Sequence, residues 1–352
     1  MLLKPLNLNL KAKFLFYQGV GLVKAEEYTA AITSLDKALQ YKPDYADAWS
    51  QRGLALGNLG QHEAAIKSFE AALALRPDGS WLWHNRGIAL GKLGRYFEAV
   101  NSFERAIEFN PDSTLAWHNR GMTLSNWGYY KEAVASFDRT LKLQPDAYWA
   151  WNNRGKALSH LRRYEDALNS FERAIEFNPD AANAWHNRSK TLSDWGHYEQ
   201  AVASFNRTLE IQPDYNQAWF NRGVALGKLG RHQEAIASFD KFIEFHPSDC
   251  WVWYNKGIAL WQMGRHEEAI KSYDRAIAIQ PGSHISWYTK ACCYAWQINI
   301  ELAIENLQQA IKLNPDKYLQ MARTASDFDK IRQDQRFQAL IQKNANKFPC
   351  QL

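Results

Sequence analysis

The sequence has few cysteines and no long apolar run, and both absences exclude classes of protein. None of the four cysteines stands in a CxxC pair, and all of them lie in the last third of the chain, at Cys250, Cys292, Cys293 and Cys350. This spacing predicts neither a disulfide framework nor a zinc site, and it favours a reducing compartment. Since no 18 consecutive residues are apolar, no helix that spans a membrane is expected.

The sequence also lacks clustered positive charge and a secretory leader. No run of five or more Lys or Arg occurs, and the net charge is +5, so a nucleic-acid partner is not implied. In the first segment, MLLKPLNLNLKAK, the polar residues Asn7 and Asn9 and the proline Pro5 interrupt any apolar stretch, unlike a signal peptide. These absences predict a cytoplasmic location.

No arrangement of residues predicts catalysis. GIALGKLG at 87–94 and GVALGKLG at 223–230 have only three residues between their first two glycines and Leu in place of Ser or Thr, so neither is a phosphate-binding loop. No HExxH, GxSxG or GxGxxG motif occurs, and histidines one repeat apart are about 10 Å apart, too far to share a metal. We expect no enzymatic activity, no metal and no cofactor.

What the sequence does have is a strict internal period. Nine prolines recur at a constant period of 34, at Pro43, Pro77, Pro111, Pro145, Pro179, Pro213, Pro247, Pro281 and Pro315. Eight tryptophans keep the same spacing, at Trp49, Trp83, Trp117, Trp151, Trp185, Trp219, Trp253 and Trp287. Self-similarity at a fixed period of about 20 to 50 residues predicts a solenoid, in which each unit is stable only when stacked on its neighbours.

One period predicts two helices. In residues 80–113 the apolar residues follow helical spacing on both sides of Gly94, which is a turn signal. Pro111 should end the second helix, and Asp112 should cap the next one. Gly87 and Ala99 are small enough for the two helices to approach closely, and we expect Phe103 to fill the space towards the neighbouring unit.

The pattern of Trp, Gly, Leu, Ala, Phe, Ala and Pro at period 34 resembles the tetratricopeptide repeat family, as found in bacteria. The resemblance implies an all-α, right-handed superhelical solenoid. It predicts a lead-in at 1–11 and a helical cap at 318–352. The nine repeats would be 12–45, 46–79, 80–113, 114–147, 148–181, 182–215, 216–249, 250–283 and 284–317. The resemblance also places the first helix of each repeat on the concave surface.

An asparagine at the second position after the tryptophan recurs in six consecutive repeats, at Asn85, Asn119, Asn153, Asn187, Asn221 and Asn255. An Asn amide can bond both the N–H and the C=O of a bound peptide. At about 10 Å per repeat and about 3.3 Å per residue of extended chain, six such steps would hold roughly 15 residues. This ladder is similar to the one in the tetratricopeptide arm of protein O-GlcNAc transferases. The alternative is an asparagine that is solvated or bonded within its own repeat.

A basic residue follows each of these asparagines. For the arginines, most repeats place an acid on the second helix of the same repeat, as in Arg86 and Glu104 or Arg120 and Asp138, while Arg188 has Asn206 there. We expect a ladder of internal ion pairs between the two helices of each repeat, rather than contacts to a ligand.

Other positions on the first helices vary, so specificity is predicted to lie there. The middle of the chain offers a moderately basic set, and the C-terminal part an aromatic one: His118, Lys156, His186 and Lys190, then Phe220, Trp251, Tyr254, Trp261 and Tyr288. An acidic segment with aromatic residues or proline would suit both. The alternative is a solvated face with additional packing between repeats.

Together these features predict a non-catalytic scaffold that binds an extended segment of a partner protein. Two alternatives stay open. Single-stranded nucleic acid could stack on Trp81, Trp149, Trp251 and Trp261 with Lys156 and Lys190 near its phosphates, or the chain could be the regulatory or substrate-recruiting subunit of a separate enzyme. The sequence indicates neither the partner nor the oligomeric state.

Overall fold

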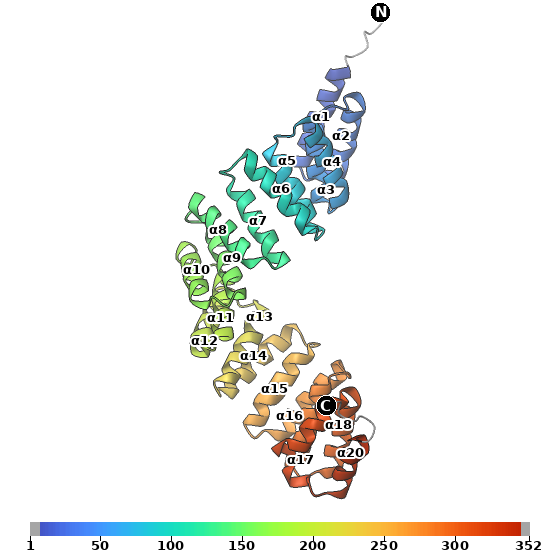
Figure 1. Cartoon of the computed structure of the whole chain (residues 1–352), viewed down its shortest axis with the longest axis vertical. Coiled ribbons are helices and arrows are strands. Elements are labelled where there is room, and N and C mark those ends of the chain that lie inside the picture. The colour runs from blue at the N-terminus through green and yellow to red at the C-terminus, as the bar shows by residue number, and fades with distance from the viewer. Residues whose placement is uncertain (1–7, 346–352) are drawn as a thin grey trace, which may run out of the picture. The chain divides into compact units, whose positions relative to one another are not determined.

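A computed structural model describes residues 8–345, with side chains to 342, and every regular element in these residues is a helix. The all-α prediction is confirmed. The first ten helices are α1 (Leu8–Lys24), α2 (Tyr28–Tyr41), α3 (Ala46–Asn58), α4 (His62–Leu75), α5 (Ser80–Lys92), α6 (Tyr96–Phe109), α7 (Thr114–Trp127), α8 (Tyr130–Leu143), α9 (Tyr148–His160) and α10 (Tyr164–Phe177). These form consecutive antiparallel pairs (Figure 1).

The remaining elements continue the pairing and then close the last repeat. They are α11 (Ala182–Trp195), α12 (Tyr198–Ile211), α13 (Asn216–Lys228), α14 (His232–Phe245), α15 (Cys250–Gln262), α16 (His266–Ile279), α17 (His284–Trp296), α18 (Ile300–Leu313), α19 (Pro315–Thr324), the 3₁₀ helix η1 (Ser326–Ile331) and α20 (Gln335–Ala345). The chain comprises two compact units, one up to Asn187 and one from Arg188.

The turn within each pair has a left-handed residue at a fixed register. Glycine takes this conformation in six repeats, for example Gly94 with φ +73° and Gly128 with φ +91°. Glycine lacks the Cβ that makes a positive φ costly. Glu26, Arg162 and Ile298 hold φ values of +61°, +58° and +60° at the same register. The chain therefore forms this turn even where the residue does not favour it.

One local prediction needs correction. The residue that caps α7 is Ser113, whose side chain accepts from the backbone N–H of Ala116, so Asp112 lies one position too early. Phe103 belongs to a buried cluster that includes Phe69 of the preceding repeat, and its ring also packs against Gly87 of its own repeat, where an added Cβ would lie 2.8 Å from the ring. The glycine of the first helix is thus a seat for the aromatic ring of the second helix.

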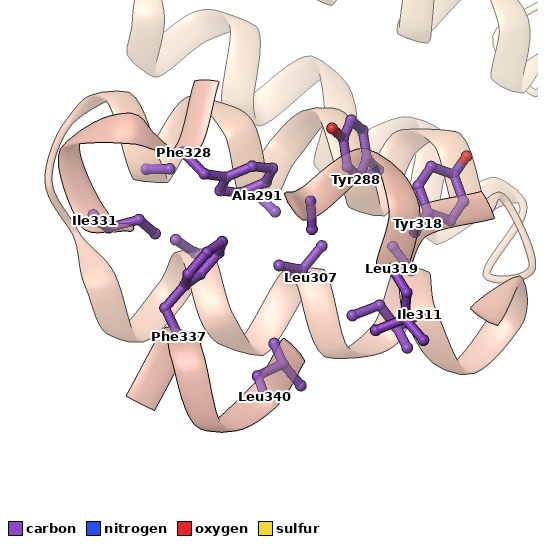
Figure 2. Close-up of a cluster of buried hydrophobic side chains, with 14 residues drawn as sticks. Tyr288, Ala291, Leu307, Ile311, Tyr318, Leu319, Phe328, Ile331, Phe337 and Leu340 are labelled. Carbon is purple, nitrogen blue, oxygen red and sulfur yellow. The ribbon is translucent and has the colours of Figure 1, made fainter. Parts of the chain in front are cut away.

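The C-terminal elements cover the last repeat, as the predicted cap requires. Phe328, Ile331, Phe337 and Leu340 pack in one buried cluster with residues of α17 and α18 such as Leu307 (Figure 2). Burying each large side chain contributes about 1.5–3 kcal/mol. The covering segment begins earlier than 318, because Pro315 is the first residue of α19. At the other end, α1 begins at Leu8, within the predicted lead-in.

Candidate functional site

The recurring tryptophan fixes each repeat to the one before it. In all eight copies its indole Nε1–H donates to the carbonyl of the proline that precedes it at the end of the previous repeat, over 2.8–3.0 Å. Trp117, for example, is in α7, and Pro111 follows α6. Pro111 lies beyond the C-cap Asn110, so the bond ties the tryptophan to the turn that connects the two repeats. The tryptophan is therefore structural, and it orients the first helix that carries the candidate site.

The basic residue at the third position after the tryptophan joins three helices. Arg120 Nη2 lies 2.8 Å from Glu104 Oε1 in the preceding repeat, and Arg120 Nη1 donates to Ser136 Oγ in its own repeat over 2.7 Å. The prediction of an internal ion-pair ladder is confirmed, but its register was wrong. In the first unit the acid that pairs with each arginine comes before it in the chain, so the pairs join neighbouring repeats rather than the helices of one repeat. Arg222 in the second unit differs, because the acid near it is Glu234 of its own repeat, at 4.0 Å.

This register holds in both units. In the first unit the pairs are Arg52–Asp36, Arg86–Glu70, Arg120–Glu104 and Arg154–Asp138. In the second unit Lys256 pairs with Asp240 and Lys290 with Asp274, whereas Arg222 meets the amide oxygen of Asn206 at 2.6 Å. Burial lowers the pKa of Arg222 from its ordinary value.

The six predicted asparagines are all half-buried on first helices. The side-chain N–H groups of Asn85 and Asn255 donate to the carbonyls of Trp81 and Trp251, each over 2.8 Å. Those bonds run along one helix, one turn back. Part of each amide is therefore used within its own repeat, as the alternative interpretation of the ladder expects.

Three further asparagines contact other side chains. Asn119 Nδ2 lies 3.4 Å from His84 Nε2, and Asn187 Nδ2 donates to Asn152 Oδ1 over 2.9 Å. Both contacts reach the preceding repeat, at the residue just after its tryptophan. Asn221 Oδ1 accepts from Gln217 at 3.4 Å. The side chain of Asn153, in α9, makes no hydrogen bond within the described part of the chain.

The predicted basic set is smaller than the sequence suggested. Lys156 and Lys190 are exposed and form no ion pair with any described residue, so both can meet a ligand. Burial lowers the pKa of His118 to about 4, and it also lowers the pKa of His84. His118 is therefore neutral at pH 7, which corrects its assignment as a basic contact. His186 is buried.

The predicted aromatic residues fall into two groups, one on the candidate surface and one packed within the fold. Trp251 is 55% exposed and meets Tyr254 edge-on, with ring centroids 6.0 Å apart. Phe220 is half-buried on α13, with its ring 5.4 Å from Phe242. These three rings remain on the candidate surface.

Two members of the aromatic set pack within the fold. Trp261 packs between His266 and Trp296, with centroids 4.1 and 5.6 Å away, near the turn of its repeat. Tyr288 is only 6% exposed, and its ring stacks on Tyr318 of the cap at 4.8 Å. Tyr288 is thus a core residue (Figure 2).

The rings of the nucleic-acid alternative differ in their exposure. Trp81 is exposed on α5, but Trp149 on α9 packs edge-on against His118 with centroids 4.3 Å apart.

No group of three His, Cys, Asp or Glu residues in the described ranges could hold a metal ion. None of the helices between residues 8 and 345 is long and apolar enough to cross a membrane.

The repeating geometry agrees with comparisons to known proteins. Family models described as tetratricopeptide repeat match residues 46–78, 148–181 and 250–283, and others match 22–60, 80–113, 102–135, 186–249 and 285–317. The chain belongs to the tetratricopeptide repeat family. A model described as protein prenyltransferase alpha subunit repeat matches residues 130–161 only, a segment of this tetratricopeptide array.

Solved structures share the fold at low sequence identity. The C-terminal part of a tetratricopeptide protein from Cytophaga hutchinsonii is 16% identical, covering 68% of this chain and 98% of that one with a TM-score of 0.58. A tetratricopeptide protein from Parabacteroides merdae is 18% identical, covering 73% and 98% with a TM-score of 0.53. YrrB, a tetratricopeptide protein with an unusual peptide-binding site, is 25% identical over 54% and 98%, with a TM-score of 0.48. No curated protein matches the chain.

Sequence reasoning missed one group of residues and one kind of contact. A serine on the second helix of the repeat accepts a second hydrogen bond from each arginine, from Arg52 with Ser68 to Arg222 with Ser238. The serine recurs at the same period as the arginines, and this recurrence was the available signal. The missed contact is the one that His84 and Asn152, each just after a tryptophan, make with the asparagine of the next repeat.

Proposed function

We propose that this tetratricopeptide chain, a protein-interaction scaffold by its family, binds an extended segment of a partner protein along the first helices of residues 80–187. The supporting observation is that four asparagines hold one register in four consecutive repeats of one compact unit: Asn85, Asn119, Asn153 and Asn187. Their recurring amides match the recurring N–H and C=O groups of a peptide main chain.

The internal hydrogen bonds of these amides support this role. Asn85, Asn119 and Asn187 each use one side-chain contact to a neighbouring residue of the surface. An amide has two N–H donors and an oxygen with two lone pairs, so one contact fixes its orientation and leaves further bonding capacity. A side chain that is already oriented loses less conformational entropy when the peptide binds.

The neighbouring side chains indicate the composition of the segment. Trp81 and Leu115 are exposed near the starts of α5 and α7, while the neutral His84 and His118 add no positive charge. Lys156 is an exposed, unpaired cation on α9. The four asparagines span three intervals of about 10 Å, so at about 3.3 Å per peptide residue the segment is about 10 residues long. It carries apolar side chains and an acidic residue towards α9.

The test starts from a library of random dodecapeptides selected on the full chain. Selected peptides are measured by fluorescence anisotropy against wild type and a variant with Asn119→Ala, Asn153→Ala and Asn187→Ala. The control carries Asn101→Ala and Asn169→Ala, two exposed positions on second helices. We expect about a tenfold or greater loss in the ladder variant only, from the loss of three net hydrogen bonds of about 0.5–1.5 kcal/mol each.

Main-chain recognition has its own readout. N-methylation of alternate peptide amides should abolish binding, whereas most single side-chain changes in the peptide should leave it within a few-fold. If the ladder variant binds as tightly as wild type, with its helical circular dichroism unchanged, the asparagines are structural and the proposal fails.

A further inference from the structure

The first helix of the chain presents an apolar stripe outwards. Phe14 is 71% exposed, Tyr17 67% and Leu10 60%, and Gly21 continues the same line with no atom near its Cβ direction. The spacing i, i+4, i+7 and i+11 places all four on one side of α1. A terminal repeat usually has a polar outer face, because that face has no neighbour.

The repeat register shows what kind of element fits this stripe. Phe14 and Gly21 are the equivalents of Ala48 and Ala55, one period later in the chain. In all eight later repeats the residues at both positions are buried, including Ala48, Leu82, Ala116, Ala150, Ala184, Ala218, Val252 and Ser286 at the first of them. The surface around Phe14 is therefore equivalent to a surface that is buried in every later repeat.

The covering element in the later repeats is the second helix of the preceding repeat. Ala48 clusters with Leu35 and Leu39 of α2, and Ala150 clusters with Leu141 of α8. The last repeat is covered as well, by α19, η1 and α20. By the same geometry, one amphipathic helix would fit along the apolar stripe of α1.

The charges beside the apolar stripe of α1 indicate what kind of helix would bind there. Lys13 and Lys24 flank the stripe on one side, and both are exposed without an ion-pair partner in the described part of the chain. Lys11 flanks it on the other side, over the ring of Tyr41. No acidic residue occurs in α1. A second copy would bring its own lysines against these, whereas an acidic helix would pair with them.

We propose that the stripe of Leu10, Phe14 and Tyr17 with its flanking lysines is a second interaction surface, which binds an acidic amphipathic helix of a partner protein. The surface lies at the end of the repeat array and is independent of the asparagine ladder. Its occupant takes the place that the second helix of a repeat takes elsewhere in the chain.

The chain itself supplies a matched pair of probes. The helix α10 has Glu165, Asp166, Glu172 and Glu176 against Arg173, a net charge of 1 − 4 = −3, and α8 has Lys131, Arg139 and Lys142 against Glu132 and Asp138, a net charge of 3 − 2 = +1. Both helices cover a first helix in the structure. Capped, labelled peptides of residues 164–181 and 130–147 also contain Asp180 and Asp146, so their net charges are 1 − 5 = −4 and 3 − 3 = 0, and they differ mainly in charge.

Fluorescence anisotropy with the full chain tests the proposal. We expect the 164–181 peptide to bind at least tenfold more tightly than the 130–147 peptide at low salt, with the preference falling as salt screens the lysines. Phe14→Ala should weaken binding about tenfold, and Lys13→Glu with Lys24→Glu should reverse the preference. The control Phe97→Ala removes a ring of α6 that is 63% exposed, close to the 71% of Phe14, and should change nothing.

Four results would overturn the proposal, given unchanged circular dichroism. The first is that neither peptide binds, or that binding ignores Phe14→Ala. The second is a concentration-dependent dimer in sedimentation that Phe14→Ala dissolves, which would make a second copy the occupant. The third is Phe14-dependent binding to phosphatidylcholine and phosphatidylglycerol vesicles. The fourth is a large gain in peptide affinity after deletion of residues 2–7, which would make the chain's own segment the occupant.

Discussion

The glycine that packs against the buried aromatic ring allows a direct test of side-chain packing in the core of each repeat. Gly121 lies in the middle of α7, and a Cβ added there would be 2.7 Å from the ring of Phe137, which is fully buried. Overpacking of this kind costs about 1–3 kcal/mol. The sixth repeat, 182–215, carries Ser189 at this register with Phe205 still buried, which places the cost in the lower part of that range.

Helix propensity acts in the opposite direction. Alanine stabilises a helix interior by about 1 kcal/mol relative to glycine, so Gly121→Ala should destabilise the fold by about 0–1 kcal/mol. Gly91 in α5 is the control, because its added Cβ would meet only Thr123 Oγ1, at 3.7 Å. Gly91→Ala should therefore stabilise the fold by about 0.5–1 kcal/mol. Both glycines lie in the compact unit that ends at Asn187. The free energies of unfolding of the two variants should differ by about 1–2 kcal/mol.

Urea unfolding followed by circular dichroism in the helical far-ultraviolet band measures this difference. Repeat arrays need not unfold in one step, so the transition midpoints are compared at matched slopes. Phe137→Leu in the Gly121→Ala background should recover part of the loss by relieving the clash. If Gly121→Ala raises the midpoint as much as Gly91→Ala does, the buried ring does not determine the residue at this position, and the reasoning is refuted.

Three further predictions use the same unfolding assay. Ile298→Gly should stabilise the chain by about 1 kcal/mol, because a β-branched residue is costly at its φ of +60° and its side chain is exposed; an unchanged midpoint would contradict this. Asn206→Asp should add up to about 1 kcal/mol at pH 7 by giving Arg222 the carboxylate that its equivalents have, and the gain should disappear when that carboxylate is protonated at low pH. Because burial lowers the pKa of His118 to about 4, the folded form binds fewer protons than the unfolded chain. Stability should fall by up to about 3 kcal/mol as pH drops from about 6.5 to about 4, and His118→Gln should remove that part of the pH dependence.

The strict periodicity explains why the ion-pair register could not be settled from most repeats. The acid that follows one arginine within its repeat is, in an ideal array, also the acid that precedes the next arginine, as Glu104 lies between Arg86 and Arg120. Lys290 breaks this symmetry, since Asp274 precedes it at the pairing register while Gln308 stands where the following acid would be. The imperfect copies therefore contained the information that the regular ones lacked.

The candidate surface was predictable in register but not in exposure. Asparagine at one position of six repeats could be read directly, and each of these side chains is half-buried on a first helix. Tyr288 and Trp261 were themselves predicted ligand contacts, yet neighbouring rings pack against both. Burial depends on what the cap and the next repeat place above each side chain, which no single period encodes.

The sequence by itself determined the helix pairs, their period and the family, because backbone preferences of glycine and proline and the spacing of apolar residues are local properties. Only the tertiary structure decided which acid meets which arginine, that His118 is neutral, and that Phe14 remains exposed while its eight equivalents are buried. Those properties depend on which atoms exclude water and which charges come within a few ångströms. Tertiary packing determines the exclusion of water and the distances between charges. It therefore distinguishes residues that occupy equivalent positions in the repeated sequence.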